Sequence, residues 1–259
     1  MRKSEFLSAL QDLVRTFRGV VSGGDETWVV KGFLDARRNI YPLSTDTKVI
    51  SKVLEWQLFP HLARFAEVHG LEMHLAARQN FYPDVSFVDS AGQRFALDLK
   101  STYRLSSTRV NGMTLGAFTG YFRNRQSTKN ITFPYGSYAG HFVLGIVYSK
   151  ADIPAEERAR YSLDQLSEIP SVAQDFCFFV QEKYRIASDR PGSGNTKNIG
   201  AVTRIEALVN GKGPFSKYRE AVFDDYWMHY MTRDMARAVA LSAPPYHSLE
   251  TYLTYRQMD

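Results

Sequence analysis

The sequence predicts an α/β fold in which a central mixed β-sheet is flanked by helices. Three observations lead to this prediction. Residues 94–100 alternate between apolar and polar side chains, residues 142–148 are almost continuously apolar, and residues 4–18 and 45–68 repeat apolar side chains at helical spacing. Alternation is typical of a strand, and a continuous apolar run is typical of a strand buried on both faces. Because the helical stripes can cover such strands, helices packed around a sheet are the expected architecture.

The N-terminal segment is predicted to be an amphipathic helix over residues 4–18. Its apolar stripe consists of Phe6, Leu7, Leu10, Leu13, Val14 and Phe17. Such a stripe either folds back onto its own subunit or forms part of a dimer interface, and the spacing leaves both open. A short strand is expected over residues 28–33. A longer helix is expected from about Thr45 to Val68, with Thr45 or Asp46 as its N-cap and Pro60 as a position that should kink or divide it.

The next predicted element is a β-hairpin. Val85–Val88 and residues 94–100 form its strands, and residues 89–93 form its turn. On the second strand the apolar side chains at odd-numbered positions face one side, whereas Asp98 and Lys100 face the other. Asp84 precedes the first strand and Asp98 stands near the end of the second. Antiparallel pairing is therefore expected to bring the two carboxylates together.

The second half of the chain is predicted to add strands and then helices. Residues 104–141 are polar and glycine-rich and are expected to be irregular. After the strand at 142–148, two shorter strands are expected around residues 176–181 and 183–187. A polar loop between residues 188 and 198 and helical segments from about 216 to 240 follow. Because no repeat or clear linker interrupts the chain, residues 1–259 are predicted to form a single domain.

Composition limits the possible partners and locations. The chain carries a formal net charge of +5 and has a pI of about 9.2, which favours a polyanionic partner without requiring one. Its single cysteine excludes an intrachain disulfide framework and a cysteine-based zinc site. The histidines lack metal-ligand spacing, and no phosphate-cradling Gly-Lys loop is present, so nucleotide hydrolysis is not expected. Without a signal peptide or a bilayer-spanning run, the expectation is a cytoplasmic protein with no membrane contact.

Asp84, Asp98 and Lys100 are the side chains with the clearest chemical potential. Two carboxylates and a lysine on adjacent strands can hold a divalent metal against a phosphodiester and hydrolyse it. The alternative interpretation is a proline–aspartate turn followed by a solvated sheet edge. Glu55, at the border of the long helix's apolar stripe, either supplies a third carboxylate or is an ordinary helix-interface residue.

Two polar segments are suited to contacting nucleic acid bases. Residues 192–198 are small and polar, which fits either a flexible surface loop or a recognition loop. In a recognition loop, glycines let the backbone approach base edges, and asparagine can pair with adenine. Arg78, Gln79 and Asn80 form a second polar cluster with amide side chains, which alone would indicate only a turn.

Taken together, these segments resemble the EcoRV-type restriction endonucleases of the PD-(D/E)xK nuclease superfamily. The resemblance runs in order from about residue 40 to residue 230. It includes Tyr82-Pro83-Asp84, Asp98-Leu99-Lys100, Thr128-Lys129-Asn130-Ile131 and Gly192-Ser193-Gly194-Asn195-Thr196. The catalytic pattern is common to the superfamily, whereas the last two segments are specific to this family. Arg78, Gly120 and Lys197 depart from the family pattern, and the first 40 and last 30 residues match poorly.

The resemblance implies a restriction-endonuclease-like core with DNA-binding loops, Mg²⁺ as cofactor, and a homodimer that cuts a short palindrome in double-stranded DNA. The first choice of site is GATATC, cut bluntly to leave 5′-phosphates. A cognate DNA methyltransferase is expected in the same cell. Residues 1–40 would form an N-terminal helix and dimerisation region, and residues 41–230 a catalytic and DNA-recognition core.

The resemblance also implies roles for individual residues. The catalytic residues would be Asp84, Asp98, Lys100 and Glu55, of which the three acids would bind metal. The DNA-binding residues would be Thr47, Lys48, Gln79, Asn80, Ser101, Thr102, Lys129, Gly192, Ser193, Gly194, Asn195, Thr196 and Lys197.

Two other functions remain open at this point. One is a non-sequence-specific or repair nuclease with the same core, against which the polar loop at residues 192–198 argues. The other is a catalytically silent DNA-binding protein, against which the presence of Asp84, Asp98 and Lys100 argues.

Overall fold

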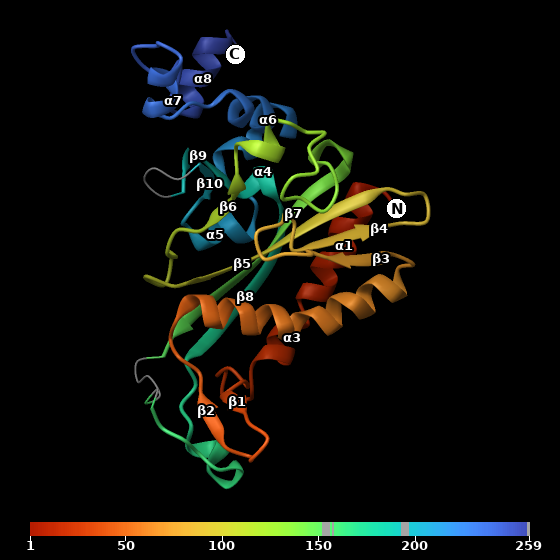
Figure 1. The fold of residues 1–259 in the computed structure, drawn as a ribbon, viewed down its shortest axis with the longest axis vertical. Helices are drawn as coiled ribbons and strands as arrows, with labels where there is room; N and C mark the ends of the chain where they lie inside the picture. Colours follow the sequence, from red (N-terminus) through yellow and green to blue (C-terminus); the bar gives the residue numbers. More distant parts are fainter. Residues whose placement is uncertain (152–155, 157, 193–196, 258–259) are drawn as a thin grey trace.

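A five-stranded mixed sheet forms the centre of the molecule in the computed structural model, which describes residues 1–151, 156, 158–192 and 197–257 (Figure 1). Its strands lie in the order β3 (Glu72–Leu75), β4 (Val85–Val88), β5 (Arg94–Tyr103), β7 (Tyr138–Lys150) and β8 (Ala173–Glu182). β5 and β7 pair in parallel, and the other neighbours pair antiparallel. The predicted α/β class with a mixed central sheet is confirmed.

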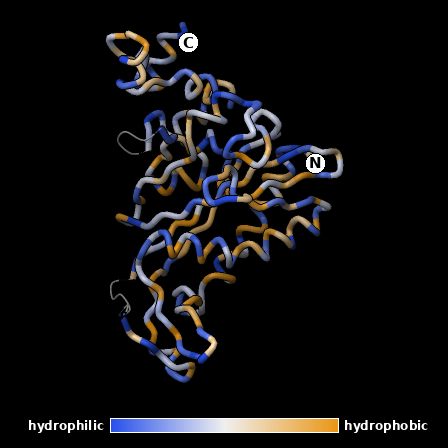
Figure 2. The backbone as a smooth tube through the Cα atoms, in the orientation of Figure 1, coloured by the Kyte–Doolittle hydropathy of each residue, from blue (hydrophilic) through white to orange (hydrophobic). Residues whose placement is uncertain are grey.

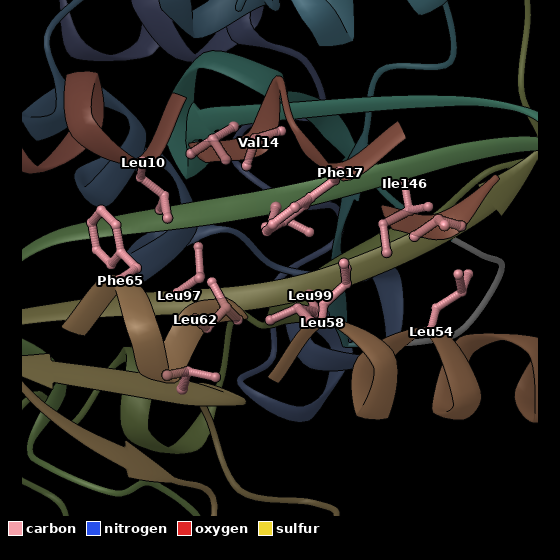
Figure 3. Close-up of a cluster of buried hydrophobic side chains, with 14 of the residues drawn as sticks. Leu10, Val14, Phe17, Leu54, Leu58, Leu62, Phe65, Leu97, Leu99 and Ile146 are labelled. Carbon is pink, nitrogen blue, oxygen red and sulfur yellow. The ribbon is translucent and has the colours of Figure 1, made fainter. Parts of the chain in front are cut away.

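Three helices cover one face of this sheet: α1 (Lys3–Val14), α2 (Phe17–Val21) and α3 (Thr47–Val68). Their apolar side chains meet those of β5 and β7 in one buried cluster (Figure 3). Phe6 is fully buried and stacks on Phe95 of β5, with ring centroids 4.4 Å apart. The N-terminal stripe therefore folds back onto its own chain, and the stripe is a core element rather than a free dimer surface.

The opposite face carries a second apolar cluster and a smaller sheet. That sheet has the order β6 (Thr114–Ala117), β10 (Asn198–Ala201) and β9 (Ala187–Pro191). The helices on this side are α4 (Lys183–Ile186), α5 (Ile205–Val209), α6 (Glu220–His229), α7 (Arg233–Ala238) and α8 (Leu249–Arg256). Short 3₁₀ turns occur at Gly120–Phe122, Tyr135–Ser137, Leu163–Glu168 and Pro214–Lys217. Tyr226 joins the C-terminal helices to β9, because its hydroxyl donates to the Asp189 carbonyl at 2.6 Å.

The predicted hairpin and long helix are confirmed in their essentials. β4 pairs with β5 as expected, and β5 continues to Tyr103. Asp46 is the N-cap of α3, since its carboxylate accepts from the Lys48 amide at 2.7 Å. Pro60 lies inside α3 without dividing it. The apolar face of this helix is packed against the sheet over its whole length, which outweighs the backbone hydrogen bond that proline removes.

Several other expectations were wrong. The strand expected over 28–33 is restricted to β1 (Gly32–Leu34), which pairs with β2 (Ile40–Pro42), while Trp28 forms only an isolated bridge. The strand expected over 183–187 is the helical turn α4, because the pairing of β8 with β7 ends at Glu182 and the chain then crosses to the second sheet. The region 104–141 contains β6 and the start of β7, and α8 lies beyond the expected C-terminal helices.

Hydropathy along the chain follows this layered arrangement. Figure 2 shows hydrophobic stretches along the central strands and alternating colours along α3, as expected of a helix with one buried face. Among the described helices, none is long and apolar enough to cross a bilayer.

Candidate active site

Asp84 and Asp98 lie side by side where β4 begins and β5 runs past it. The register pairs Val85 with Leu97, so the residue before β4 stands next to Asp98. One carboxylate oxygen of Asp84 accepts the Leu99 amide hydrogen at 2.7 Å, which ties the Asp84 side chain to β5. Asp98 is 4% exposed. The predicted convergence of the two carboxylates is therefore present.

Lys100 completes this group from two residues further along β5. Its Nζ lies 2.7 Å from Asp98 Oδ2 and 3.7 Å from Asp84 Oδ2. Alternation along the strand explains the placement, since Leu97 and Leu99 belong to the helix-covered core whereas Ala96 belongs to the opposite cluster. Asp98 and Lys100 consequently share the face away from α3.

When both are ionised, the Asp84 and Asp98 carboxylates carry one more negative charge than the Lys100 ammonium neutralises. Burial, followed by the charge of Asp98, raises the pKa of Asp84 from 3.8 to about 7, although Lys100 and the Leu99 amide oppose the shift. Burial disfavours the charged form of Lys100, but Asp98 and Asp84 outweigh it and raise the pKa of that lysine. A second cation at this position would relieve the repulsion between the two carboxylates.

An open cavity of about 500 Å³ gives access to the group. Its walls include Asp84, Asp98 and Lys100 together with three residues that the sequence assigned to DNA binding: Gln79, Asn80 and Lys129. Tyr121 and Asn198 also line the cavity. Asn198 belongs to the polar segment 192–198 that was expected to suit base contacts. Tyr121 was not predicted, because an isolated tyrosine in an irregular region carries no sequence pattern that points to a site.

Residues of α3 line the neighbouring hollows. Thr47, Ser101 and Thr102 border a cavity of about 380 Å³ beside Lys100. Lys48 borders a larger one of about 760 Å³ that also reaches Asp84 and Gln79. Thr102 is largely buried, and its hydroxyl donates to the Asn111 carbonyl at 2.7 Å. Of the predicted DNA-binding residues that line these cavities, Ser101 and Thr102 both have hydroxyls already hydrogen-bonded within the protein, since Ser101 Oγ lies 2.6 Å from Ser51 Oγ.

Glu55 stands at the edge of the site rather than within it. It lines both hollows beside α3, and its carboxylate pairs with Lys52 at 2.6 Å. Its charge also raises the pKa of Asp84, but by less than burial and the charge of Asp98 do. Within the described residues, no three His, Cys, Asp or Glu side chains are arranged to hold one metal ion.

The polar loop is described only at its ends, since Ser193, Gly194, Asn195 and Thr196 lie outside the described residues. The amide of Gly192 donates to the Asn198 carbonyl at 3.0 Å, and the Lys197 carbonyl accepts from Phe118 at 2.9 Å. A side chain at Gly192 would come within 2.6 Å of Thr114, so the close approach of these strands requires glycine. The described ends of the loop therefore adjoin the small sheet, whose strands β6 and β10 contribute residues to the wall of the catalytic cavity.

The sequence matches the family described as "Restriction endonuclease EcoRV" over residues 24–257. It is 35% identical over 209 residues to "Type II restriction enzyme EcoRV" of Escherichia coli, which covers 80% of this chain and 84% of that protein. The chain belongs to the EcoRV restriction endonuclease family, and it is a type II site-specific deoxyribonuclease.

The family match extends beyond the predicted range of residues 40–230, because it covers residues 24–257. Among solved structures, "NlaIV restriction endonuclease" is similar with a TM-score of 0.41 and 10% identity, covering 93% of this chain and 90% of that chain. A likeness at this level adds nothing to the assignment, which rests on the sequence matches.

Proposed function

We propose that this enzyme uses Mg²⁺ to cut double-stranded DNA at GATATC, leaving blunt ends with 5′-phosphates. The observation that carries the proposal is the group formed by the buried Asp98 and the partly buried Asp84 and Lys100, which lines an open cavity. The same cavity collects amide and lysine side chains suited to a nucleic acid. The positive net charge of +5 also suits a polyanionic substrate.

The residues present fit a magnesium ion. Carboxylate oxygens are the hard ligands that Mg²⁺ prefers, and two of them leave coordination positions for water and a phosphate oxygen. Burial, followed by repulsion from Asp98, raises the pKa of Asp84 to about 7, and a nearby dication would stabilise the ionised pair. When bound, Mg²⁺ supplies a polarised phosphate and a water of lowered pKa.

The protein's own groups then have defined tasks. Asp98 orients Lys100 through their 2.7 Å ion pair, and the Leu99 amide orients Asp84. Lys100 offers an ammonium group that can hold the attacking water or offset the negative charge that builds on the phosphate. For Glu55 we propose a supporting role at the margin of the metal site, which requires its pair with Lys52 to open.

The DNA contacts are proposed on the same basis. Residues 192–196 would read the outer base pairs of each half-site in the major groove, and Gln79 and Asn80 would approach the minor groove. The central step would be selected by its ease of bending rather than by contact. Thr47, Lys48, Ser101, Thr102, Lys129 and Lys197 would contact the backbone, and Lys197 should steepen the salt dependence of binding.

Digestion of a sequenced plasmid with Mg²⁺, followed by mapping of the ends, tests the proposed site. We expect cleavage only at GATATC, with blunt 5′-phosphorylated ends, because each good base contact is worth about 1–3 kcal/mol of discrimination. Ca²⁺ should support specific binding without cutting. The Asn195→Ala variant should lose discrimination while retaining metal binding. Ends that map to a site without the outer GA…TC pairs would disprove the assigned sequence.

We also propose that residues 1–259 act as one endonuclease domain and pair as a symmetric homodimer, because a palindrome presents the same groups to each half of a two-fold protein. The hairpin β1–β2 lies at one end of the molecule, opposite the C-terminus (Figure 1). It exposes Phe33 (46%), Leu34 (60%) and Tyr41 (46%), an apolar surface suited to a second copy.

Sedimentation of a charged variant tests this surface. Leu34→Asp should shift the protein from dimer to monomer, because a carboxylate would be desolvated in the interface. Leu241→Asp, which changes a 41% exposed leucine near the C-terminus, serves as the matched control. A Leu34→Asp variant that remains dimeric would exclude the hairpin as the interface.

The biological setting follows from the proposed activity. An enzyme that cuts GATATC would also cut the DNA of its own cell. We therefore propose that it acts in the cytoplasm alongside a methyltransferase that modifies the same sequence.

A further inference from the structure

Lys183 is a fully buried lysine beneath the catalytic cavity. It is the first residue of α4, directly after β8, and only 1% of it is exposed. Among the described residues, no group accepts a hydrogen bond from its Nζ. The pairing of Asp98 with Val143, and of Val143 with Gln181, places this end of β8 two strands away from Asp98.

Aromatic rings surround the ammonium group instead of acceptors. The Nζ of Lys183 lies 4.6 Å from the ring centroid of Tyr82, 5.4 Å from that of Tyr135 and 5.7 Å from that of Phe122. Cation–π attraction returns part of the energy lost when a charge leaves water, but it does not replace hydrogen bonds to the ammonium. A methionine of similar length could fill the same space without that cost.

The rings connect Lys183 to the catalytic residues. Tyr82 stacks on Tyr121, with centroids 5.3 Å apart, and Tyr121 lines the cavity with Asp84 and Asp98. Tyr82 is also the first residue of the Tyr82-Pro83-Asp84 segment. A contact that fixes the Tyr82 ring therefore also fixes the position of the backbone that leads to Asp84. The Nζ is close enough to Gly116 that an added side chain there would meet it at 3.6 Å, and Gly116 lines the same cavity.

The charges around Lys183 agree with this placement. Burial lowers its pKa to about 8, and Asp98 is the carboxylate that opposes the shift most, followed by Asp224; Lys100 and Arg125 act in the same direction as burial. Asp98 is therefore the carboxylate that interacts most strongly with the Lys183 ammonium.

We propose that Lys183 is a positioning residue of the active site: its buried ammonium holds the Tyr82 ring and sets a fixed positive charge behind Asp98. This inference rests on the proposed metal-dependent cleavage and adds a residue that touches neither DNA nor metal. A fixed cation in a water-excluded region stabilises negative charge that develops on the phosphate, without reorganising during the reaction. Its removal should slow the chemical step rather than weaken DNA binding.

The test compares Lys183→Met with Lys217→Met in the full-length protein. Lys217 is exposed in the 3₁₀ turn after α5, so its variant makes the same change in side chain and net charge outside the catalytic machinery. For each variant we would measure the melting temperature, DNA affinity in Ca²⁺, the single-turnover cleavage rate in saturating Mg²⁺, and the Mg²⁺ concentration giving half the maximal rate.

For Lys183→Met we expect a single-turnover cleavage rate that is lower than the wild-type rate by roughly tenfold. DNA affinity and the half-saturating Mg²⁺ concentration should be unchanged, because Lys183 touches neither DNA nor metal. The melting temperature should be unchanged or higher, because a costly buried charge has been removed. A rate equal to that of Lys217→Met would overturn the proposal. A lower melting temperature or failure to fold would also overturn it, since the lysine would then be a structural element. If the wild type and Lys217→Met fail to cleave with Mg²⁺, the proposed function itself is at fault.

Discussion

Asp84→Asn is expected to reduce the rate of DNA cleavage by on the order of 10³-fold or more, while the metal-free protein becomes no less stable. The amide retains an oxygen that can accept the Leu99 N–H, so the local structure is preserved. It removes the negative charge that the proposed metal needs. It also removes the repulsion from Asp98, which together with burial raises the pKa of Asp84 to about 7. Function and stability should therefore change in opposite directions.

The same pKa gives two dependences on pH. Because the ionised carboxylate is the form that binds a cation, wild-type activity at subsaturating Mg²⁺ should rise as pH increases through about 7. Folding stability without metal should show the opposite trend. The folded protein holds the Asp84 proton more tightly than the unfolded chain, whose pKa is near 3.8, so this contribution to stability is complete below about pH 4 and is lost as pH rises through about 7.

Thermal unfolding in EDTA and single-turnover cleavage, both across pH 5 to 9, would measure these trends. Asp84→Asn should remove the Asp84 contribution to the decline in stability. Asp234→Asn provides the control, because Asp234 lies on α7 with a side chain that is 77% exposed. Cleavage by Asp84→Asn at the wild-type rate would show that this carboxylate is not part of the catalytic group.

Lys100→Met is expected to reduce cleavage by about 10²–10³-fold without weakening metal binding. The substitution removes the ammonium group that stands 2.7 Å from Asp98 and is proposed to act on the water or the phosphate. A dication would then bind without repulsion from that ammonium. Without metal, the buried Asp98 and the partly buried Asp84 would remain with no cation in contact, so the melting temperature should fall and then recover when Mg²⁺ is added.

Calorimetric titration of Mg²⁺ and melting curves with and without the metal would separate these effects. Measurements at pH 8.5 keep Asp84 mostly ionised in the wild type, whose pKa for that group is about 7. Lys217→Met again controls for the loss of one lysine charge. If Lys100→Met cuts at the wild-type rate, the role assigned to Lys100 is incorrect. If it binds Mg²⁺ much more weakly, the lysine shapes the metal site instead of acting on the reaction.

The sequence alone was sufficient for the elements whose patterns are local. Alternation in residues 94–100 predicted which face Asp98 and Lys100 occupy, and the hairpin register predicted that Asp84 would join them. Helical spacing predicted α3 and α1, although the helix expected over residues 4–18 ends at Val14 and Phe17 begins α2. Residue type and position gave Thr45 and Asp46 as N-cap candidates, of which the structure has Asp46. These predictions succeeded because strand and helix periodicity depend on neighbouring residues and are not reversed by distant contacts.

Tertiary structure decided the features that depend on residues distant in sequence. The stripe of α1 could have met a second subunit, but contact with β5 and α3 buries it within the chain. Residues 183–187 were expected to form a strand. They form the helical turn α4 instead, because the pairing of β8 with β7 ends at Glu182. Lys183 carries no local signal, and only the packing of Tyr82, Phe122 and Tyr135 around it reveals a buried charge. Burial is a property of the whole fold, and burial is what changes the chemistry of Asp84 and Lys183.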